Sequence, residues 1–290
     1  MKPIEAIEKR QSIREFRKLK LTEKQINEIR DYYTSIKALI PDIETELVIS
    51  TGDDAKIRLE GSAGYRGHAF GAPAYITILS EKKENYVLNA GFIAENLILK
   101  LVEMSIENCW LTTNGSDNIK RALCLEESDK EAVVVIACGE GKKERTLTRL
   151  DIKTPSNVKV SKRKGHIAPK IAQDEMVFYG KWGEPVDWTI IDPQLDRALY
   201  AASLAPSFLN RQPYRYILDD HHVILLSRLS EEGTSEEDII LDSGATMANF
   251  DAVYSGYYSN CKGWICGEPS GAEAVSTPEG FRIVAYYDLV

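Results

Sequence analysis

Three polar side chains near the N-terminus have the types and the spacing to hold a phosphate group. Arg10, Ser12 and Arg14 occupy alternate positions, and alternate side chains of an extended segment project from the same side. Guanidinium groups match phosphate oxygens in paired hydrogen bonds, and a serine hydroxyl adds a short neutral donor. A surface cluster of ion pairs with the neighbouring Glu8 and Glu15 is the alternative explanation.

A second candidate binding segment, APSFLNRQPY, lies far downstream at residues 205–214. The carboxamides of Asn210 and Gln212 offer both donors and acceptors, as the edge of a pyrimidine-type ring demands. Pro206 and Pro213 stiffen the segment and reduce the entropy that is lost when it holds a ligand. By composition alone, a capped helix end followed by a turn explains the segment slightly better.

Together the two segments resemble the signature motifs of the nitroreductase family of FMN-dependent oxidoreductases. The string APSxxNxQP followed by an aromatic residue is the specific part of this resemblance. Residues 71–75 (GAPAY) resemble a family strand, residues 108–111 (NCWL) resemble a helix end, and residues 162–164 (KRK) lie near where members often place a further phosphate-side cation. The resemblance covers most of the chain in altered order, because family members carry the two motifs much closer together.

The resemblance implies an α+β, nitroreductase-like fold with mainly antiparallel sheets flanked by helices, and a bound FMN. The first motif and the basic cluster would hold phosphate and ribityl, and the second motif would hold and tune the ring. Two threonines replace the small residues that approach the flavin in many members, which leaves the ring environment open. The cofactor-binding residues so implied are Arg10, Ser12, Arg14, Arg163, Lys164, Pro206, Ser207, Asn210, Gln212, Thr112 and Thr113.

Two segments of the chain repeat at a constant offset of 153 residues, from Gly91 to Gly244 and from Asn96 to Asn249. Each segment has the apolar periodicity of a helix opening. Similar strands surround both segments, and this order of elements favours a tandem duplication over a chance succession of helices and strands. The strands expected from β-branched and aromatic content are 46–50, 74–79, 132–137, 215–218, 222–227 and 281–287.

Helix-capping signals open the corresponding helices of the two copies. Thr22 and Gln25 have the spacing of a capping box, and Asp192 precedes Pro193 as a cap precedes the first helical turn. The second of these helices must end near Ala205, because a proline disfavours helical geometry in the residue before it.

Each copy keeps the motif that the other has lost. The first copy has IPDIE at residues 40–44 where the APSxxNxQP loop would fall, and the second has PVDWT at 185–189 where the arginines would fall. Family members are typically homodimers whose two FMN sites each combine motifs from both subunits. We therefore expect a single chain that acts as a pseudo-dimer, with halves at 1–180 and 181–290, one intact site and one vestigial site. The lysine-rich stretch 139–170 would be a connector or an extended arm.

The resemblance implies a flavin oxidoreductase that takes a hydride from NADH or NADPH and reduces a small organic acceptor such as a nitroaromatic, quinone or enone. No catalytic side chain is expected, because the cofactor carries the chemistry. The alternatives are a non-catalytic flavin- or ligand-binding protein of the same fold, and an interaction scaffold that has lost flavin.

The composition limits the classes of partner and the cellular compartment that we expect for this chain. A formal net charge of −8 argues against a nucleic-acid-binding surface. The most apolar stretch, 90–102, is interrupted by Glu95 and Lys100, so no membrane span is expected, and the N-terminus lacks a signal-peptide pattern, which favours the cytoplasm. Five irregularly spaced cysteines and four histidines give neither a disulfide framework nor a metal-ligand pattern, so no metal is expected.

Overall fold

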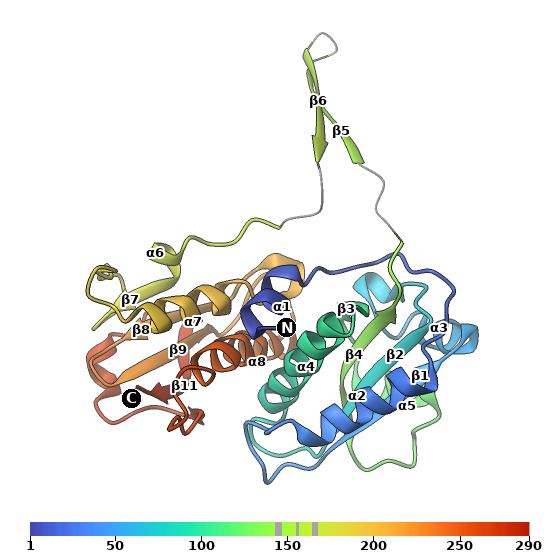
Figure 1. The fold of residues 1–290 in the computed structure, drawn as a ribbon, viewed down its shortest axis with the longest axis horizontal. Helices are drawn as coiled ribbons and strands as arrows, with labels where there is room; N and C mark the ends of the chain where they lie inside the picture. The colour runs from blue at the N-terminus through green and yellow to red at the C-terminus, as the bar shows by residue number, and fades with distance from the viewer. Residues whose placement is uncertain (143–146, 155–156, 164–167, 290) are drawn as a thin grey trace.

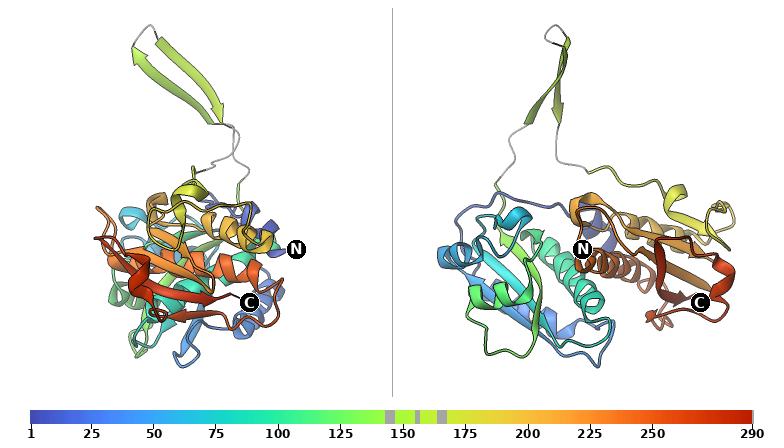
Figure 2. Two further views of the ribbon diagram at one scale, coloured as in Figure 1. Left: turned by 90° about the vertical axis from the view of Figure 1, so that its left-hand side faces the viewer. Right: turned by 180° about the vertical axis from the view of Figure 1, so that it is seen from behind.

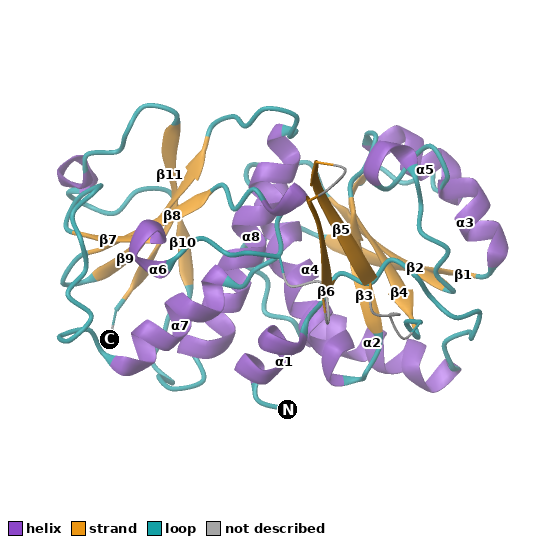
Figure 3. Ribbon diagram, turned by 90° about the horizontal axis from the view of Figure 1, so that it is seen from above, coloured by secondary structure: helices purple, strands orange, loops and turns teal. Residues whose placement is uncertain are grey.

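The computed structural model describes residues 1–142, 147–154, 157–163 and 168–289, and for the residues between 147 and 163 it describes the backbone. Two sheets stand at opposite ends of the body, and long helices fill the space between them (Figures 1 and 3). In the described part of the chain, no helix is both long and apolar enough to cross a bilayer.

The first half of the chain forms a four-stranded antiparallel sheet with the order β1-β2-β4-β3. Alternate residues of β2 face opposite sides: Ile76 and Ile78 pack under α2 and α4, whereas Tyr75 packs with α3 and α5. The strands are β1 (Thr45–Thr51), β2 (Ala74–Ser80), β3 (Glu107–Leu111) and β4 (Glu131–Gly139). The helices are α2 (Glu23–Ser35), α3 (Asp53–Leu59), α4 (Tyr86–Glu103) and α5 (Ser116–Leu123), with a 3-10 turn at Tyr65–Gly67.

The second half forms a five-stranded sheet with the order β10-β11-β9-β8-β7, in which only the β7–β8 pair is parallel among the described strands. Two helices, α7 and α8, cover one face through a core that includes Tyr216 and Tyr287. The strands are β7 (Val177–Tyr179), β8 (Tyr214–Leu218), β9 (His222–Arg228), β10 (Trp264–Cys266) and β11 (Phe281–Asp288). The helices are α6 (Gln173–Met176), α7 (Pro193–Ser203) and α8 (Glu236–Tyr254), with 3-10 turns at Phe208–Asn210 and Ala272–Val275.

Helices α4 and α8 pack side by side at the centre of the molecule (Figure 3). They meet backbone to backbone at the two glycines of the sequence repeat. A Cβ atom on Gly244 would lie 2.5 Å from the Leu88 carbonyl oxygen, and one on Gly91 would lie 2.7 Å from the Leu241 carbonyl oxygen. The short N-terminal helix α1 (Pro3–Lys9) buries Ile4 and Ile7 in the core of the second half. It therefore ends at the junction between the halves.

The segment between the two sheets forms an extended arm. Strands β5 (Leu147–Thr154) and β6 (Asn157–Arg163) pair as an antiparallel hairpin that projects from the body in all three views (Figures 1 and 2). The chain then runs back over the second half and adds β7 to the edge of its sheet.

Most of the local structure matches the sequence-based expectations. The six predicted strands are confirmed as β1, β2, β4, β8, β9 and β11, and the Thr22–Gln25 capping box and the Asp192 cap are both present. Helix α7 ends at Ser203, close to the predicted stop.

Two expectations about helices were wrong. Gly91 and Gly244 lie inside α4 and α8 rather than at helix openings, because their role is to admit the backbone of the other helix. Residues 108–111 form β3 rather than a helix end, because their backbone pairs with β4 and their buried side chains fill the first half.

Candidate functional site

The first polar motif follows α1 and runs along β3, the strand at the edge of the first sheet. Ser12 forms a parallel bridge with Asn108, and the Ile13 backbone N–H donates to the Asn108 carbonyl at 2.9 Å. This pairing keeps residues 10–14 out of helical geometry, so that the three polar side chains of the motif gather at one place.

The buried Cys109 thiol marks that place. Burial raises the pKa of Cys109, and the guanidiniums of Arg14 and Arg10 and a hydrogen bond with the Ser12 side chain act in the opposite direction. Arg14 is exposed and lies 5.9 Å from the centre of the Phe70 ring. The Arg10 side chain is only 11% exposed, and its Nε and Nη1 atoms have no hydrogen-bond partner among the described residues.

The second motif is a tight loop between α7 and β8. Leu209, Asn210 and Gln212 adopt left-handed conformations with φ between 48° and 57°, which cost energy in residues other than glycine. The loop is held from outside and from within: the Phe208 N–H donates to the Asp242 carboxylate of α8 at 3.1 Å, and the Gln212 N–H donates to the Ser207 hydroxyl at 3.0 Å.

The two carboxamides of the loop bind the returning connector. The Asn210 Nδ2 atom donates to the Pro169 carbonyl at 2.6 Å, and the Gln212 Oε1 atom accepts from the Ile171 N–H at 2.9 Å. Between these two anchors stands Lys170, whose ammonium donates to the Ala205 carbonyl at 2.6 Å. Asn210 and Gln212 therefore fix the position of a half-buried cation.

Lys170 and Arg10 lie close enough at the junction of the two halves for their charges to interact. Burial and, second, the Arg10 charge lower the pKa of Lys170 to about 8, and the carboxylates of Glu95 and Asp242 oppose this shift. Burial likewise raises the pKa of Asp242 and of the Tyr214 phenol, which donates to the same Ala205 carbonyl at 3.2 Å. The junction thus concentrates two cations in a poorly hydrated place.

Aromatic rings border this cluster on the side of the exposed Arg14. Tyr65 of the first half and Phe208 of the second half lie with ring centres 6.5 Å apart, and Phe70 lies under Arg14. Tyr65 is 49% exposed and the other two rings are half-buried. Cations next to partly exposed aromatic surface can accommodate a ligand with a phosphate and a flat ring.

Comparison with known proteins decides the family. A family model described as "Putative TM nitroreductase" matches residues 2–179. The chain belongs to this nitroreductase family. A crystal structure of a "putative nitroreductase" from Thermotoga maritima matches with a TM-score of 0.61 at 15% identity, covering 99% of this chain and 93% of that chain. At this identity the match shows the fold alone, and the predicted α+β nitroreductase-like fold, with antiparallel sheets flanked by helices, is confirmed.

Shorter nitroreductases also match. An FMN-dependent nitroreductase from Clostridium difficile covers 48% of this chain and 88% of its own length, with 18% identity and a TM-score of 0.41. A nitroreductase family protein from Clostridium novyi covers 66% of this chain and 100% of its own length, with 16% identity and a TM-score of 0.44. Among curated proteins, none matches this chain.

The remaining predicted site residues lie farther from Arg10 and Lys170. Thr112 and Thr113 follow β3 and pair with the loop before Tyr65: the Thr112 carbonyl accepts from the Gly64 N–H at 2.8 Å, and Thr113 bridges Ala63. Arg163 is the last residue of β6, where the structure describes the backbone alone, and Lys164 lies outside the described residues. Lys170 is the basic residue that the structure places beside Arg10.

Sequence reasoning missed three members of the cluster: Lys170, Glu95 and Asp242. Only Glu95 carried a signal, because it interrupts an otherwise apolar helical stretch. Lys170 and Asp242 owe their positions to contacts with the loop of the second motif, which no local pattern in the chain reveals.

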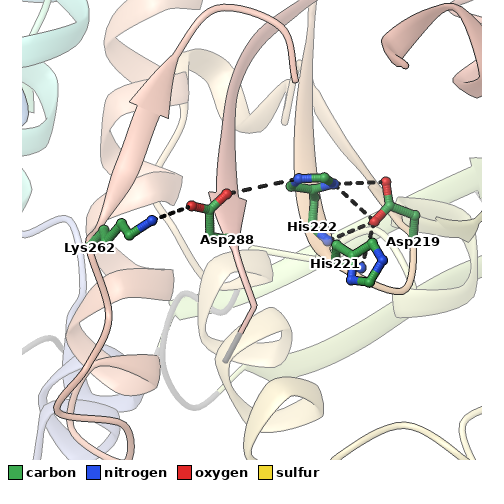
Figure 4. A network of polar contacts seen from close by, with 5 residues as sticks. All are labelled: Asp219, His221, His222, Lys262 and Asp288. Carbon is green, nitrogen blue, oxygen red and sulfur yellow. Dashed lines mark hydrogen bonds and ion pairs between the residues drawn. The ribbon is translucent and has the colours of Figure 1, made fainter. Parts of the chain in front are cut away.

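A separate polar network lies around the β8–β9 turn and the end of β11 (Figure 4). Asp219 accepts from the backbone N–H groups of His221 and His222 at 2.7 Å and closes the β8–β9 turn, and Asp288 accepts from Lys262 at 3.4 Å. An open cavity of about 340 Å³ adjoins it, lined by His221, His222, Asn260, Lys262, Asp288 and Leu289. In the described part of the chain, no three His, Cys, Asp or Glu side chains group in a way that could hold a metal ion.

Proposed function

We propose that this protein is an FMN-dependent oxidoreductase that takes a hydride from NADH or NADPH and reduces a small organic acceptor such as a nitroaromatic, quinone or enone. The observation that carries the proposal is the pair Arg10 and Lys170 at the junction. Two nitrogens of Arg10 are buried without a hydrogen-bond partner among the described residues, and the half-buried Lys170 is close enough for its charge to interact with Arg10. Buried donors of this kind are costly unless a ligand satisfies them, and a phosphate does so well.

The residues present fit FMN. Arg10, Ser12, Arg14 and Lys170 would hold the phosphate and ribityl chain, with Arg163 and Lys164 as further candidate cations. The loop of Pro206 and Ser207 would border the ring, beside Thr112 and Thr113, while Asn210 and Gln212 fix Lys170. When bound, FMN would supply the hydride chemistry, and the chain would contribute binding, orientation and exclusion of water.

We also propose that the chain arose by tandem duplication and forms one intact site between its halves. The repeat offset of 153 relates Asn89 to Asp242, and both residues do the same work. The Asn89 side-chain oxygen accepts from the Ile40 N–H at 2.9 Å, as Asp242 accepts from the Phe208 N–H. The segment after Ile40 is thus held by α4 as the second motif is held by α8, and it lacks the two carboxamides of that motif, which supports a vestigial second site.

The test is the flavin content of the purified full chain, counted per chain from the visible spectrum after release and again after incubation with FMN. One FMN per chain that is bleached by NADH or NADPH supports the proposal. A bound FMN that neither nucleotide reduces favours a non-catalytic binder, and no FMN after incubation favours a scaffold. Two flavins per chain would contradict the single site.

The phosphate assignment has its own matched pair of variants. Arg14→Glu reverses a charge that faces the cluster, so we expect it to lose FMN. Lys18→Glu reverses an exposed charge four residues later, so it should retain FMN. Equal FMN content in the two variants, both with wild-type circular dichroism, would refute the assignment.

A further inference from the structure

One buried carboxylate at the junction has no role in the proposed function. Glu95 lies on α4 with its side chain 0% exposed. Its Oε2 atom accepts from the Trp110 indole N–H at 3.2 Å. Its Oε1 atom lies 4.0 Å from Arg10 Nε and has no hydrogen-bond partner among the described residues. A carboxylate is thus aimed at the guanidinium that we assign to the phosphate.

Charged and titratable groups from several elements surround Glu95. Arg10 follows α1, Lys170 comes from the connector, and Trp110 belongs to β3. Asp242 of α8 interacts electrostatically with Lys170 and accepts a hydrogen bond from the Phe208 N–H. The charges of Asp242, Glu95 and Arg10 also affect the pKa of the Tyr214 phenol of β8. The cluster therefore contains two cations balanced by two buried carboxyl groups.

A phosphate dianion changes this balance. Against Arg10 and Lys170 it places two negative charges close to Glu95, in surroundings where charges are poorly screened. Like charges at one place raise the pKa of the weaker acid until it binds a proton. A protonated Glu95 still offers an oxygen to Trp110, so protonation removes the repulsion without breaking that hydrogen bond.

We propose that Glu95 takes up a proton when a phosphate-bearing cofactor binds, so that the site exchanges a buried carboxylate charge for the phosphate and keeps both cations. This inference rests on the proposed FMN site and adds a proton linkage to it. Binding of the cofactor then becomes tighter as the pH falls toward neutrality, through a residue that does not itself touch the flavin ring.

The ionised fraction of Glu95 before the cofactor binds sets the size of the expected proton uptake. Burial raises the pKa of Glu95 to about 7, although Arg10, the Trp110 hydrogen bond and Lys170 oppose the shift. About half of the Glu95 side chains are then ionised at pH 7. Lys170, with a pKa lowered to about 8 by burial and Arg10, is then about nine-tenths protonated and contributes little uptake of its own.

The experiment is isothermal titration calorimetry of the flavin-free full chain with FMN at pH 7.0, in PIPES and in imidazole. The binding enthalpy varies with the ionisation enthalpy of the buffer in proportion to the protons exchanged. We expect an uptake of about half a proton with FMN and none with riboflavin, which lacks the phosphate. Glu95→Gln should abolish the uptake. Glu103→Gln, the same change at a partly exposed carboxylate on the same helix, should keep it.

Each possible result either supports or overturns the proton linkage. FMN binding without proton uptake, or with an uptake that persists in Glu95→Gln, overturns the linkage and leaves the FMN site standing. An equal uptake with riboflavin also overturns it. Absence of FMN binding refutes both the site and the linkage. If Glu95→Gln does not fold, the wild-type chain still answers, because its proton uptake must fall between pH 7.0 and pH 5.5, where Glu95 is mostly protonated before the cofactor binds.

Discussion

At the crossing of α4 and α8, the structure allows the loss of stability on adding one methyl group to be estimated. We expect Gly244→Ala to lower the stability of the protein, although alanine in a helix gains about 1 kcal/mol over glycine. The added methyl carbon would lie 2.5 Å from the Leu88 carbonyl oxygen and 2.7 Å from the Phe92 nitrogen. Both are backbone atoms of α4, which cannot rotate away as a side chain can.

The magnitude comes from these distances. Ordinary contact begins at 3.4 Å, so the helices must part by roughly 0.9 Å at this point. Overpacking costs about 1–3 kcal/mol, and a clash with backbone belongs at the upper end of that range. After the gain in helix propensity, a net loss of about 2 kcal/mol remains, which is about 3 °C in Tm for a chain of this size.

The assay is thermal unfolding of the flavin-free protein, with Gly71→Ala as the control. A Cβ atom on Gly71 would meet only the Lys56 side chain, at 3.8 Å or more, so we expect a change within about 0.5 kcal/mol. If Gly244→Ala melts with the control or above it, the two helices do not pack backbone to backbone, and the reasoning from this crossing fails.

Three further predictions concern single contacts. Asp192→Ala removes the acceptor of the Gln194 and Leu195 N–H groups at 2.8 and 3.0 Å, and should cost about 1 kcal/mol in urea unfolding; an unchanged midpoint would deny the cap. Gln212→Leu removes the acceptor of the Ile171 N–H, so hydrogen exchange of residues 168–172 should quicken, and unchanged protection would show that Gln212 does not anchor the connector. Glu95 has a folded-state pKa raised from 4.5 to about 7, so its contribution to stability is full below pH 4.5 and is lost as the pH rises to 7. Glu95→Gln should therefore gain on the wild type by up to about 3 kcal/mol between pH 5 and pH 8, and parallel pH profiles would refute this.

Local signals in the sequence predicted local structure well. The Thr22–Gln25 box and the Asp192–Pro193 cap involve neighbouring residues only, so the information that fixes them lies within one turn of helix. The β-branched run at 222–227 likewise predicts β9. By contrast, residues 108–111 form a strand because β4 offers them a pairing edge, which the four residues do not encode.

For the candidate site too, the sequence predicted the residues that are close together in the chain and not those brought together by packing. The arginine motif was visible because its spacing alone brings its side chains to one side. Lys170 was not visible, because it is placed by carboxamides forty residues further along the chain, in a loop whose left-handed residues have no simple sequence signature. Glu95 could be noticed as a charge in an apolar stretch, but its facing partner, Arg10, became apparent only from the packing of α1 between the halves.

The position of Arg10, Lys170 and the 206–212 loop within one chain has a consequence for dilution. Groups on separate subunits meet at a rate and to an extent set by protein concentration, whereas groups on one chain meet at an effective concentration that the chain itself fixes. The juxtaposition of these residues therefore holds at nanomolar protein as well as at millimolar protein.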